Sequence, residues 1–350
     1  MPRPPSTNAT TTEPGKLNLI TDVPGILVGH AADTRAASGV TAILFGTPDR
    51  TATVAAVTRG GAPGTRDTTL LEPEMTVAGI HAVVLSGGSL FGLDAAGGVV
   101  SHLRKAGIGL RIGGAVVPIA SQAICFDLLN GGDKDWGRVP PYWELGWQAA
   151  SSARGGSFAL GTVGGGYGAT TATLKGGLGS ASITTASGYT VGALAIVNAV
   201  GSATIGDGPH FWAAPLEQDG EFGGRGMPHA FSGSDLAPRL KGGAPPSTTI
   251  ALVATDARLS KAEAKRIAIM ADDGLARALR PAHAPMDGDT VFAAATGLRI
   301  LDQPAVHLTE IGMAAGDCLA RAIARGVYEA TALPFAGALP TWREKFGTTN

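Results

Sequence analysis

Short apolar runs rich in β-branched residues recur along this 350-residue chain, and such runs limit it to folds built around sheets. The runs cover residues 40–45, 53–57, 81–85, 191–197, 249–254 and 291–295. Segments with helical spacing lie between or after them, at residues 89–106, from Ser260 onward and at residues 313–325. Ser260 and Glu263 have the spacing that caps a helix N-terminus. This order of elements predicts a layered α/β fold, with α+β as the competing class.

Length and composition allow a large hydrophobic core. Hydrophobic residues make up 44% of the chain, which is long enough for one large domain or two small ones. Residues 1–16 are rich in Pro, Thr and Ser, so we expect a flexible tail ahead of a single domain at residues 17–350. No apolar stretch is long enough for a membrane-spanning helix, and we expect no membrane partner.

Charge and cysteine content argue against several classes of partner. The 27 Lys and Arg residues are matched by 28 Asp and Glu residues, so no basic field is available to bind nucleic acid. The only cysteines, Cys125 and Cys318, give neither a disulfide framework nor a zinc signature. We therefore expect a cytoplasmic protein without a metal or other cofactor.

A hydroxyl residue stands where a Gly/Pro-rich segment, residues 201–246, meets the apolar run at residues 249–254. We expect this segment to cross the surface and to leave a reachable, strained processing site at its end. Thr248 could attack the carbonyl of Ser247, and cleavage there would leave a threonine with a free α-amine beside its hydroxyl. Such a residue is nucleophile and base at once.

Two glycine-rich segments have weaker signals. Gly87-Gly88-Ser89 follows an expected strand and opens an expected helix, but the segment matches neither the dinucleotide fingerprint nor the nucleophile elbow. It is either a tight strand-to-helix turn or a turn whose amides line a substrate pocket. Residues 161–168 lack the Lys-Ser/Thr pair of a phosphate-binding loop, and Lys175 beyond them is by itself an ordinary solvated lysine.

Two polar positions at the ends of apolar runs leave alternatives open. Asp287 and Asp289 could form a solvated Asp-Gly turn, could share a proton because like charges raise a pKa, or could hold a metal, for which no close His pair exists. Asn198 follows residues 191–197 and could either close that strand with an Asx turn or donate to an oxyanion.

Several segments together resemble the L-aminopeptidase/D-esterase (DmpA-like) family, which includes β-aminopeptidases and the nylon-oligomer hydrolase that acts on 6-aminohexanoate amides. The resemblance rests on blocks in the same order along most of the chain. These blocks are Ile20-Thr21-Asp22-Val23-Pro24-Gly25 with Val28-Gly29-His30, then Arg59-Gly60-Gly61-Ala62-Pro63-Gly64-Thr65-Arg66-Asp67, Gly87-Gly88-Ser89-Leu90-Phe91-Gly92-Leu93-Asp94-Ala95-Ala96, and Asp287-Gly288-Asp289-Thr290.

The resemblance implies an αββα sandwich similar to the N-terminal-nucleophile hydrolases and self-cleavage into residues 1–247 and 248–350. It implies that Thr248 is the nucleophile, that Asp287 and Asp289 position it, that Asn198 is on the oxyanion side and that Lys175 lies in the pocket. This chain departs from relatives in having Ser247 before the nucleophile and Phe126 where some have a tyrosine. Relatives also assemble as homo-oligomers of the cleaved heterodimer.

The expected activity is hydrolysis of small peptides or amides that bear a free amino group. The narrower alternative is 6-aminohexanoate-oligomer hydrolysis, and the alternative of another class is an uncut, noncatalytic small-molecule binding protein. Asp94 or Glu72 could meet the substrate ammonium, although the sequence places neither in a pocket.

Overall fold

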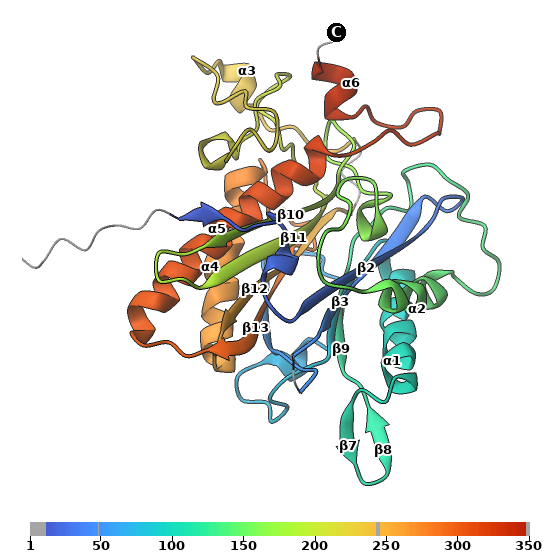
Figure 1. The fold of residues 1–350 in the computed structure, drawn as a ribbon. Coiled ribbons are helices and arrows are strands. Elements are labelled where there is room, and N and C mark those ends of the chain that lie inside the picture. Colours follow the sequence, from blue (N-terminus) through green and yellow to red (C-terminus); the bar gives the residue numbers. More distant parts are fainter. Residues whose placement is uncertain (1–11, 48, 243–245, 348–350) are drawn as a thin grey trace, which may run out of the picture.

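Two sheets packed face to face form the centre of the molecule in the computed structural model, which describes residues 12–47, 49–242 and 246–347. The first sheet has the order β1-β10-β11-β12-β13-β4, and the second has the order β2-β3-β6-β9-β5. Helices α4 (Lys261–Ala278) and α5 (Pro304–Tyr328) cover the first sheet, while α1 (Ala95–Lys105) and α2 (Tyr142–Ser152) cover the second (Figure 1). The predicted αββα sandwich is therefore confirmed.

The strands of the first sheet are β1 (Glu13–Pro14), β4 (Thr53–Thr58), β10 (Gly177–Thr184), β11 (Thr190–Asn198), β12 (Thr248–Ala257) and β13 (Thr290–Arg299). Those of the second are β2 (Ile26–Asp33), β3 (Ser38–Phe45), β5 (Thr65–Arg66), β6 (Ala82–Ser86) and β9 (Ala120–Ile124). A separate hairpin of β7 (Leu110–Ile112) and β8 (Ala115–Val117) projects from the body. Short elements complete the chain: η1 (Ile20–Asp22), η2 (Thr69–Leu71), η3 (Ser89–Asp94), η4 (Gly164–Gly166), η5 (Ala214–Leu216), α3 (Gly233–Leu236) and α6 (Trp342–Phe346).

Alternation along β12 divides its side chains between two cores. Ile250, Leu252 and Ala254 face the layer between the sheets, whereas Ala251 and Val253 face α4 and α5. Because side chains alternate across a strand, Thr248 belongs to the inter-sheet face and Thr249 to the helix face. The nucleophile candidate therefore points between the sheets.

The elements expected from the sequence are largely present. All the predicted apolar runs lie in strands, with β6 shifted by one residue, and the Ser260–Glu263 capping box begins α4. Residues 313–325 form only part of α5, which begins nine residues earlier at Pro304. β2, β9 and β10 were not predicted; β10 is fully buried up to its last residue but consists mainly of small and polar residues.

The predicted helix at residues 89–106 is regular only from Ala95. Residues 89–94 form the 3₁₀ helix η3, because Gly88 and Ser89 have left-handed φ angles of 85° and 52° and the Gln122 side chain takes over helix hydrogen bonds. The Gln122 side-chain NH₂ donates to the Gly92 carbonyl at 2.6 Å, and the Gln122 side-chain oxygen accepts from Ala96 N at 2.9 Å. The turn is thus tighter than a continuous helix.

The expected tail and surface segment differ in part from the structure. Glu13 and Pro14 form β1, paired with β10, while residues 1–11 lie outside the described residues. Within residues 201–246, Ala203, Phe211 and Phe222 pack into the core between the first sheet and its helices. Residues 201–206 are buried throughout, whereas residues 224–240 lie largely at the surface, and residues 243–245 lie outside the described residues.

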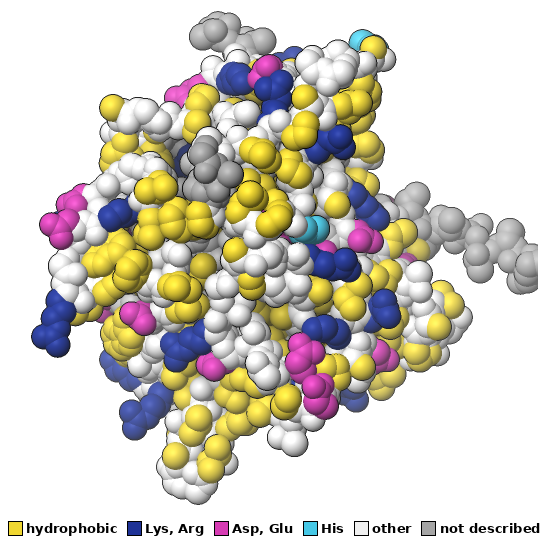
Figure 2. All heavy atoms as spheres, turned by 180° about the vertical axis from the view of Figure 1, so that it is seen from behind, with side chains coloured by type: hydrophobic (Ala, Val, Ile, Leu, Met, Phe, Trp, Pro, Cys, Tyr) yellow, Lys and Arg dark blue, Asp and Glu magenta, His cyan; other side chains and the backbone are white. Residues whose placement is uncertain are grey.

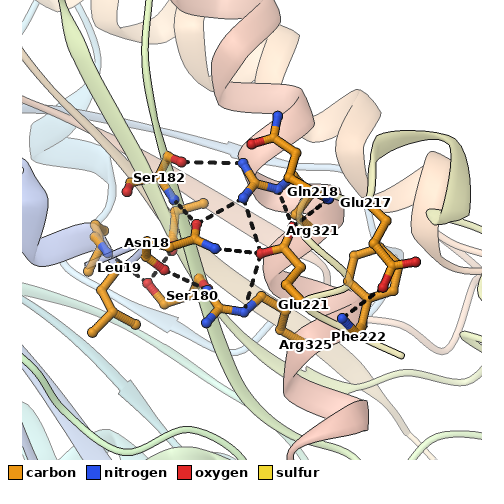
Figure 3. Close-up of polar contacts among 12 residues, drawn as sticks. Asn18, Leu19, Ser180, Ser182, Glu217, Gln218, Glu221, Phe222, Arg321 and Arg325 are labelled. Atoms are coloured by element: carbon orange, nitrogen blue, oxygen red, sulfur yellow. Dashed lines mark hydrogen bonds and ion pairs between the residues drawn. The ribbon is translucent and has the colours of Figure 1, made fainter. Parts of the chain in front are cut away.

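A buried ion cluster joins parts of the chain that lie on either side of Thr248 (Figure 3). Arg321 on α5 is fully buried and binds Glu221 in a bidentate manner at 2.5 and 3.1 Å. Arg325 lies one turn further along α5, and its Nε is 3.4 Å from Glu221 Oε2. The side-chain amide of Asn18 donates to the same Glu221 oxygen at 2.6 Å. The cluster therefore fixes α5 to the segment around Glu221 and to the N-terminal region.

Mixed charges cover the face shown in Figure 2. Basic, acidic and hydrophobic side chains are interspersed there, in keeping with the formal net charge of -1. Among the described helices, none has the length and hydropathy needed to cross a membrane.

Candidate active site

Thr248 and Asn198 face each other at the end of two central strands. They are directly paired in the antiparallel register of β11 and β12, so their side chains lie on the same face of the sheet. Thr248 is only 3% exposed and Asn198 is fully buried. The sequence prediction that these residues share one site is consistent with this geometry.

The Thr248 hydroxyl lies against the carbonyl group of the residue before it. Thr248 Oγ1 is in a very short contact with the Ser247 carbonyl oxygen, which also accepts a hydrogen bond from Gly288 N at 2.9 Å. An N–H on this oxygen polarises the carbonyl toward attack. The junction is buried, with Ser247 at 0% exposure, so the expectation of a reachable processing site is wrong. An attack by Thr248 on the carbonyl of the residue bonded to it needs no protease to reach the junction from solvent.

Two of the sequence blocks quoted above form one contact around this junction. Ala62 N donates to the Asp287 carbonyl at 2.7 Å and Arg59 N to the Asp289 carbonyl at 3.1 Å. A Cβ on Gly288 would lie 2.8 Å from Thr248 Oγ1 and 2.7 Å from the Ala62 carbonyl oxygen. Glycine is therefore required at position 288 by the close approach of Thr248 and the Arg59-to-Pro63 segment.

The two carboxylates contact backbone N–H groups near Thr248. Asp289 Oδ1 accepts from Thr249 N at 2.8 Å. Asp287 accepts from Ala284 N at 3.1 Å and from Val200 N at 3.4 Å. Burial, reinforced by the neighbouring Asp289 carboxylate, raises the pKa of Asp287 to about 6. Asp289 therefore holds the backbone directly after Thr248, and Asp287 ties together the neighbouring segments at Ala284 and Val200.

Asn198 is fixed by a polar network. Its side-chain NH₂ donates to the Phe126 carbonyl at 2.8 Å, and its oxygen accepts from Thr170 N at 3.0 Å and Lys241 Nζ at 3.2 Å. The amide orientation follows from these partners, and one N–H remains for an oxyanion. Phe126 acts here through its carbonyl. Lys241, which the sequence analysis missed, has a pKa lowered by burial to about 8.

Lys175 reaches the site only through the backbone. Its ammonium donates to the carbonyls of Gly166, Ala169 and Gly176 at 3.2, 3.0 and 2.9 Å. Burial lowers the pKa of Lys175 to about 7. With each of its donors on a carbonyl, this lysine holds the loop that presents Thr170 to Asn198.

A cavity of about 50 Å³ lies beside three of the residues that hold Asn198 by hydrogen bonds. It is lined by Phe126, Asp127, Leu129, Asn130, Thr170 and Lys241. Gly87, Gly88 and Ser89, expected in the pocket, are not among the residues that line this cavity. Gly88 N instead donates to Asp127 Oδ1 at 2.7 Å, and Ser89 N donates to the Cys125 carbonyl at 3.0 Å.

The acidic side chain of this cavity is Asp127, which the sequence analysis missed. Burial raises the pKa of Asp127, and the hydrogen bonds from Ser38 and Gly88 oppose that rise. Of the two carboxylates considered earlier, Glu72 pairs with Lys265 at 3.0 Å and Asp94 is exposed at the start of α1. Neither lines the cavity. In the described parts of the chain, no group of three acidic, His or Cys side chains is arranged to hold a metal ion.

Solved aminopeptidase structures share this fold. The fold matches that of a Burkholderia sp. beta-aminopeptidase with a TM-score of 0.70 and 22% identity, covering 97% of this chain and 94% of that one. The fold also matches the L-aminopeptidase D-Ala-esterase/amidase from Ochrobactrum anthropi with a TM-score of 0.67 and 20% identity, covering 96% of this chain and 94% of that one. That structure is described as a variant of the Ntn hydrolase fold. The fold of this chain is thus of the Ntn-hydrolase type.

The family follows from the sequence comparisons. The model of Peptidase family S58 matches residues 18–338, and the chain belongs to this family. An uncharacterized aminopeptidase of Mycobacterium tuberculosis (strain H37Rv) is 44% identical over 352 residues, which cover 94% of this chain and 98% of that protein. The protein is therefore an aminopeptidase-like hydrolase of peptide or amide bonds, and the noncatalytic alternative is not retained.

Proposed function

We propose that the chain cuts itself between Ser247 and Thr248 and then acts as an N-terminal-threonine amide hydrolase on peptides or amides with a free amino group. The observation that carries this proposal is the contact between Thr248 Oγ1 and the Ser247 carbonyl, whose oxygen accepts the Gly288 N–H. The proposed nucleophile (Thr248 Oγ1), the scissile carbonyl (Ser247) and an oxyanion donor (Gly288 N–H) therefore lie in contact at a buried site.

In the first stage, Thr248 Oγ attacks the Ser247 carbonyl carbon and the C–N bond breaks. The hydroxyl proton passes to the departing nitrogen, so the acyl group moves from nitrogen to oxygen. Water then hydrolyses the ester, which leaves a carboxylate on Ser247 and a free amine on Thr248. Gly288 N–H stabilises the oxyanion of this stage.

In the second stage, the α-amine of Thr248 takes the proton of its own hydroxyl as that oxygen attacks the substrate amide. The ordinary pKa of an α-amine is about 7.7 to 8.0, so a substantial neutral fraction exists near pH 7. The remaining N–H of the Asn198 amide supports the oxyanion, and Asp287 and Asp289 orient the backbone. Water releases the acyl group and completes the cycle.

The test is the Thr248→Ala variant beside Thr249→Ala as a matched control. The first should remain one uncut band on denaturing electrophoresis and should hydrolyse nothing. The second should be cut and active, because the Thr249 side chain lies on the helix face of β12. Mass spectrometry of the small fragment should show Thr248 as its first residue. Cleavage and full turnover in Thr248→Ala would refute the proposal.

The substrate class rests on the cavity beside Asn198. Asp127 is the acidic side chain there, and a substrate ammonium would bind near it. A narrower candidate is supported by the 6-aminohexanoate-oligomer endohydrolase of Kocuria sp., which is 29% identical over 293 residues covering 81% of this chain and 76% of that protein. Turnover of an amino-acid p-nitroanilide compared with a 6-aminohexanoate oligomer would separate the two. We further propose that the cut heterodimer forms a homo-oligomer.

A further inference from the structure

A series of ionic contacts runs from Asp289 through His283 to Asp272 and the half-exposed Arg59. Asp289 Oδ2 lies 2.9 Å from His283 Nδ1, and His283 Nε2 lies 3.3 Å from Asp272 Oδ2. Arg59 Nε is 3.5 Å from the same Asp272 oxygen. Asp289 and Asp272 have side chains that are 2% and 3% exposed, so both carboxylates depend on these partners.

The backbone of His283 is held in a conformation that favours glycine. Its φ is +57°, and its N–H donates to Asp289 Oδ2 at 3.0 Å. A non-glycine residue in the left-handed region carries a conformational cost. An imidazole is thus placed beside Asp289 at a position where glycine would fit the backbone better.

We propose that His283, held by Asp272, is a positioning residue that fixes the Asp289 carboxylate against Thr249 N and so sets the place of Thr248 in both cleavage and turnover. This inference rests on the proposed function. Asp289 has one oxygen on Thr249 N and the other on His283, so the two contacts together define its orientation. Loss of the imidazole leaves a buried carboxylate with less support and a nucleophile strand that is less well fixed.

The charged groups that face His283 favour its cationic form. Burial would lower the pKa of His283, but the close carboxylates of Asp289 and Asp272 outweigh burial and raise it, with Arg59 opposing. Asp273 lies beside Asp272 on α4 and acts on that carboxyl. Removal of the Asp272 charge should therefore lower the pKa of His283.

The experiment compares His283→Gly, His283→Gln and Asp272→Asn with the full-length parent protein. His283→Gly should fold, because glycine suits a φ of +57°, and should lower kcat per cut molecule by about 100-fold with little change in KM, as a small misplacement of a nucleophile does. His283→Gln, which keeps an N–H donor, should recover part of that loss. Deprotonation of His283 at high pH should lower kcat, and Asp272→Asn should shift this decline to lower pH because it lowers the pKa of His283.

The matched control is Asp219→Gly, an exposed non-glycine residue with a φ of +52° outside the site, which should keep parental turnover. Slower self-cleavage in the His283 variants supports the same inference, since the strand is positioned for both steps. Parental cleavage and kcat in His283→Gly, with an unchanged pH profile in Asp272→Asn, would overturn it. The proposed function fails separately, through an active Thr248→Ala protein measured in parallel.

Discussion

At the scale of single residues, the site depends on how closely the backbone of Gly288 approaches Thr248. Gly288 supplies the N–H on the Ser247 carbonyl, and its Cα faces the Thr248 hydroxyl and the Ala62 carbonyl. These neighbours are backbone atoms or a short buried side chain, so they have little freedom to move aside. A single methyl group at this position therefore tests the site.

Gly288→Ala should slow self-cleavage and lower turnover by at least about tenfold, because its Cβ would lie 2.8 Å from Thr248 Oγ1. The rate is measured as the fraction of cut chain against time on denaturing gels. Gly114→Ala is the control, since a Cβ there meets no atom within 4 Å. Equal cleavage rates in the two variants would show that the close approach has no catalytic consequence.

The raised pKa of Asp287 predicts an acidic limb in the pH profile. This carboxyl has a pKa of about 6 through burial and the nearby Asp289, so it becomes neutral as pH falls through that value. Ionised Asp287 accepts the N–H groups of Ala284 and Val200, and loss of its charge weakens this support of the backbone near Thr248, so kcat/KM should decline below about pH 6. Asp287→Asn should be less active and should lack this limb. A limb that persists in Asp287→Asn would belong to another group, of which Asp272, also at about 6 through burial, is the nearest candidate.

At the scale of elements, the sequence predicted strands better than the side chains that surround Thr248. Thr248, Asn198, Asp287 and Asp289 were identified because they stand at strand ends or in quoted blocks. Asp127, Lys241, Asp272 and His283 have no such local pattern and meet only through tertiary folding. Asp272 lies in α4, where a polar residue is expected to face solvent, yet it is buried while Asp273 beside it is exposed.

The attachment of α5 predicts a large stability effect from one carboxylate. Glu221→Gln would leave the fully buried Arg321 without its anionic partner, and it should lower the free energy of unfolding by about 3–5 kcal/mol. Chemical denaturation monitored by circular dichroism measures the change. Asp207 pairs with Arg239, and its side chain is 72% exposed. Asp207→Asn should therefore lower the free energy of unfolding by less than about 1 kcal/mol. Equal effects of the two changes would contradict the importance of burial in the Arg321 cluster.

At the scale of the whole molecule, the proposed cut falls between segments that remain interleaved. β12 lies between β11, which precedes the junction, and β13, which follows it, and β13 pairs in turn with β4 from the other side of the junction. The Arg321 cluster adds ionic contacts between the same two pieces. The fold is thus continuous across the cut in its sheet, its core and its buried charges.

Both fragments should therefore elute together in gel filtration under native conditions and should separate only in denaturant. The physical reason is that separation would expose β11 and β12 edges and the apolar surface of α4 and α5 together. The uncut Thr248→Ala protein serves as the size reference. A fragment of residues 1–247 that elutes alone without denaturant would contradict this expectation.

The burial of Ser247 and Thr248 has a consequence for how activity would arise in a cell. The Gly288 N–H reaches the Ser247 carbonyl only in the folded chain, so under the proposed mechanism a nascent or misfolded polypeptide would keep the junction inert. Each molecule would then become active only after it has folded correctly, without a separate processing protease.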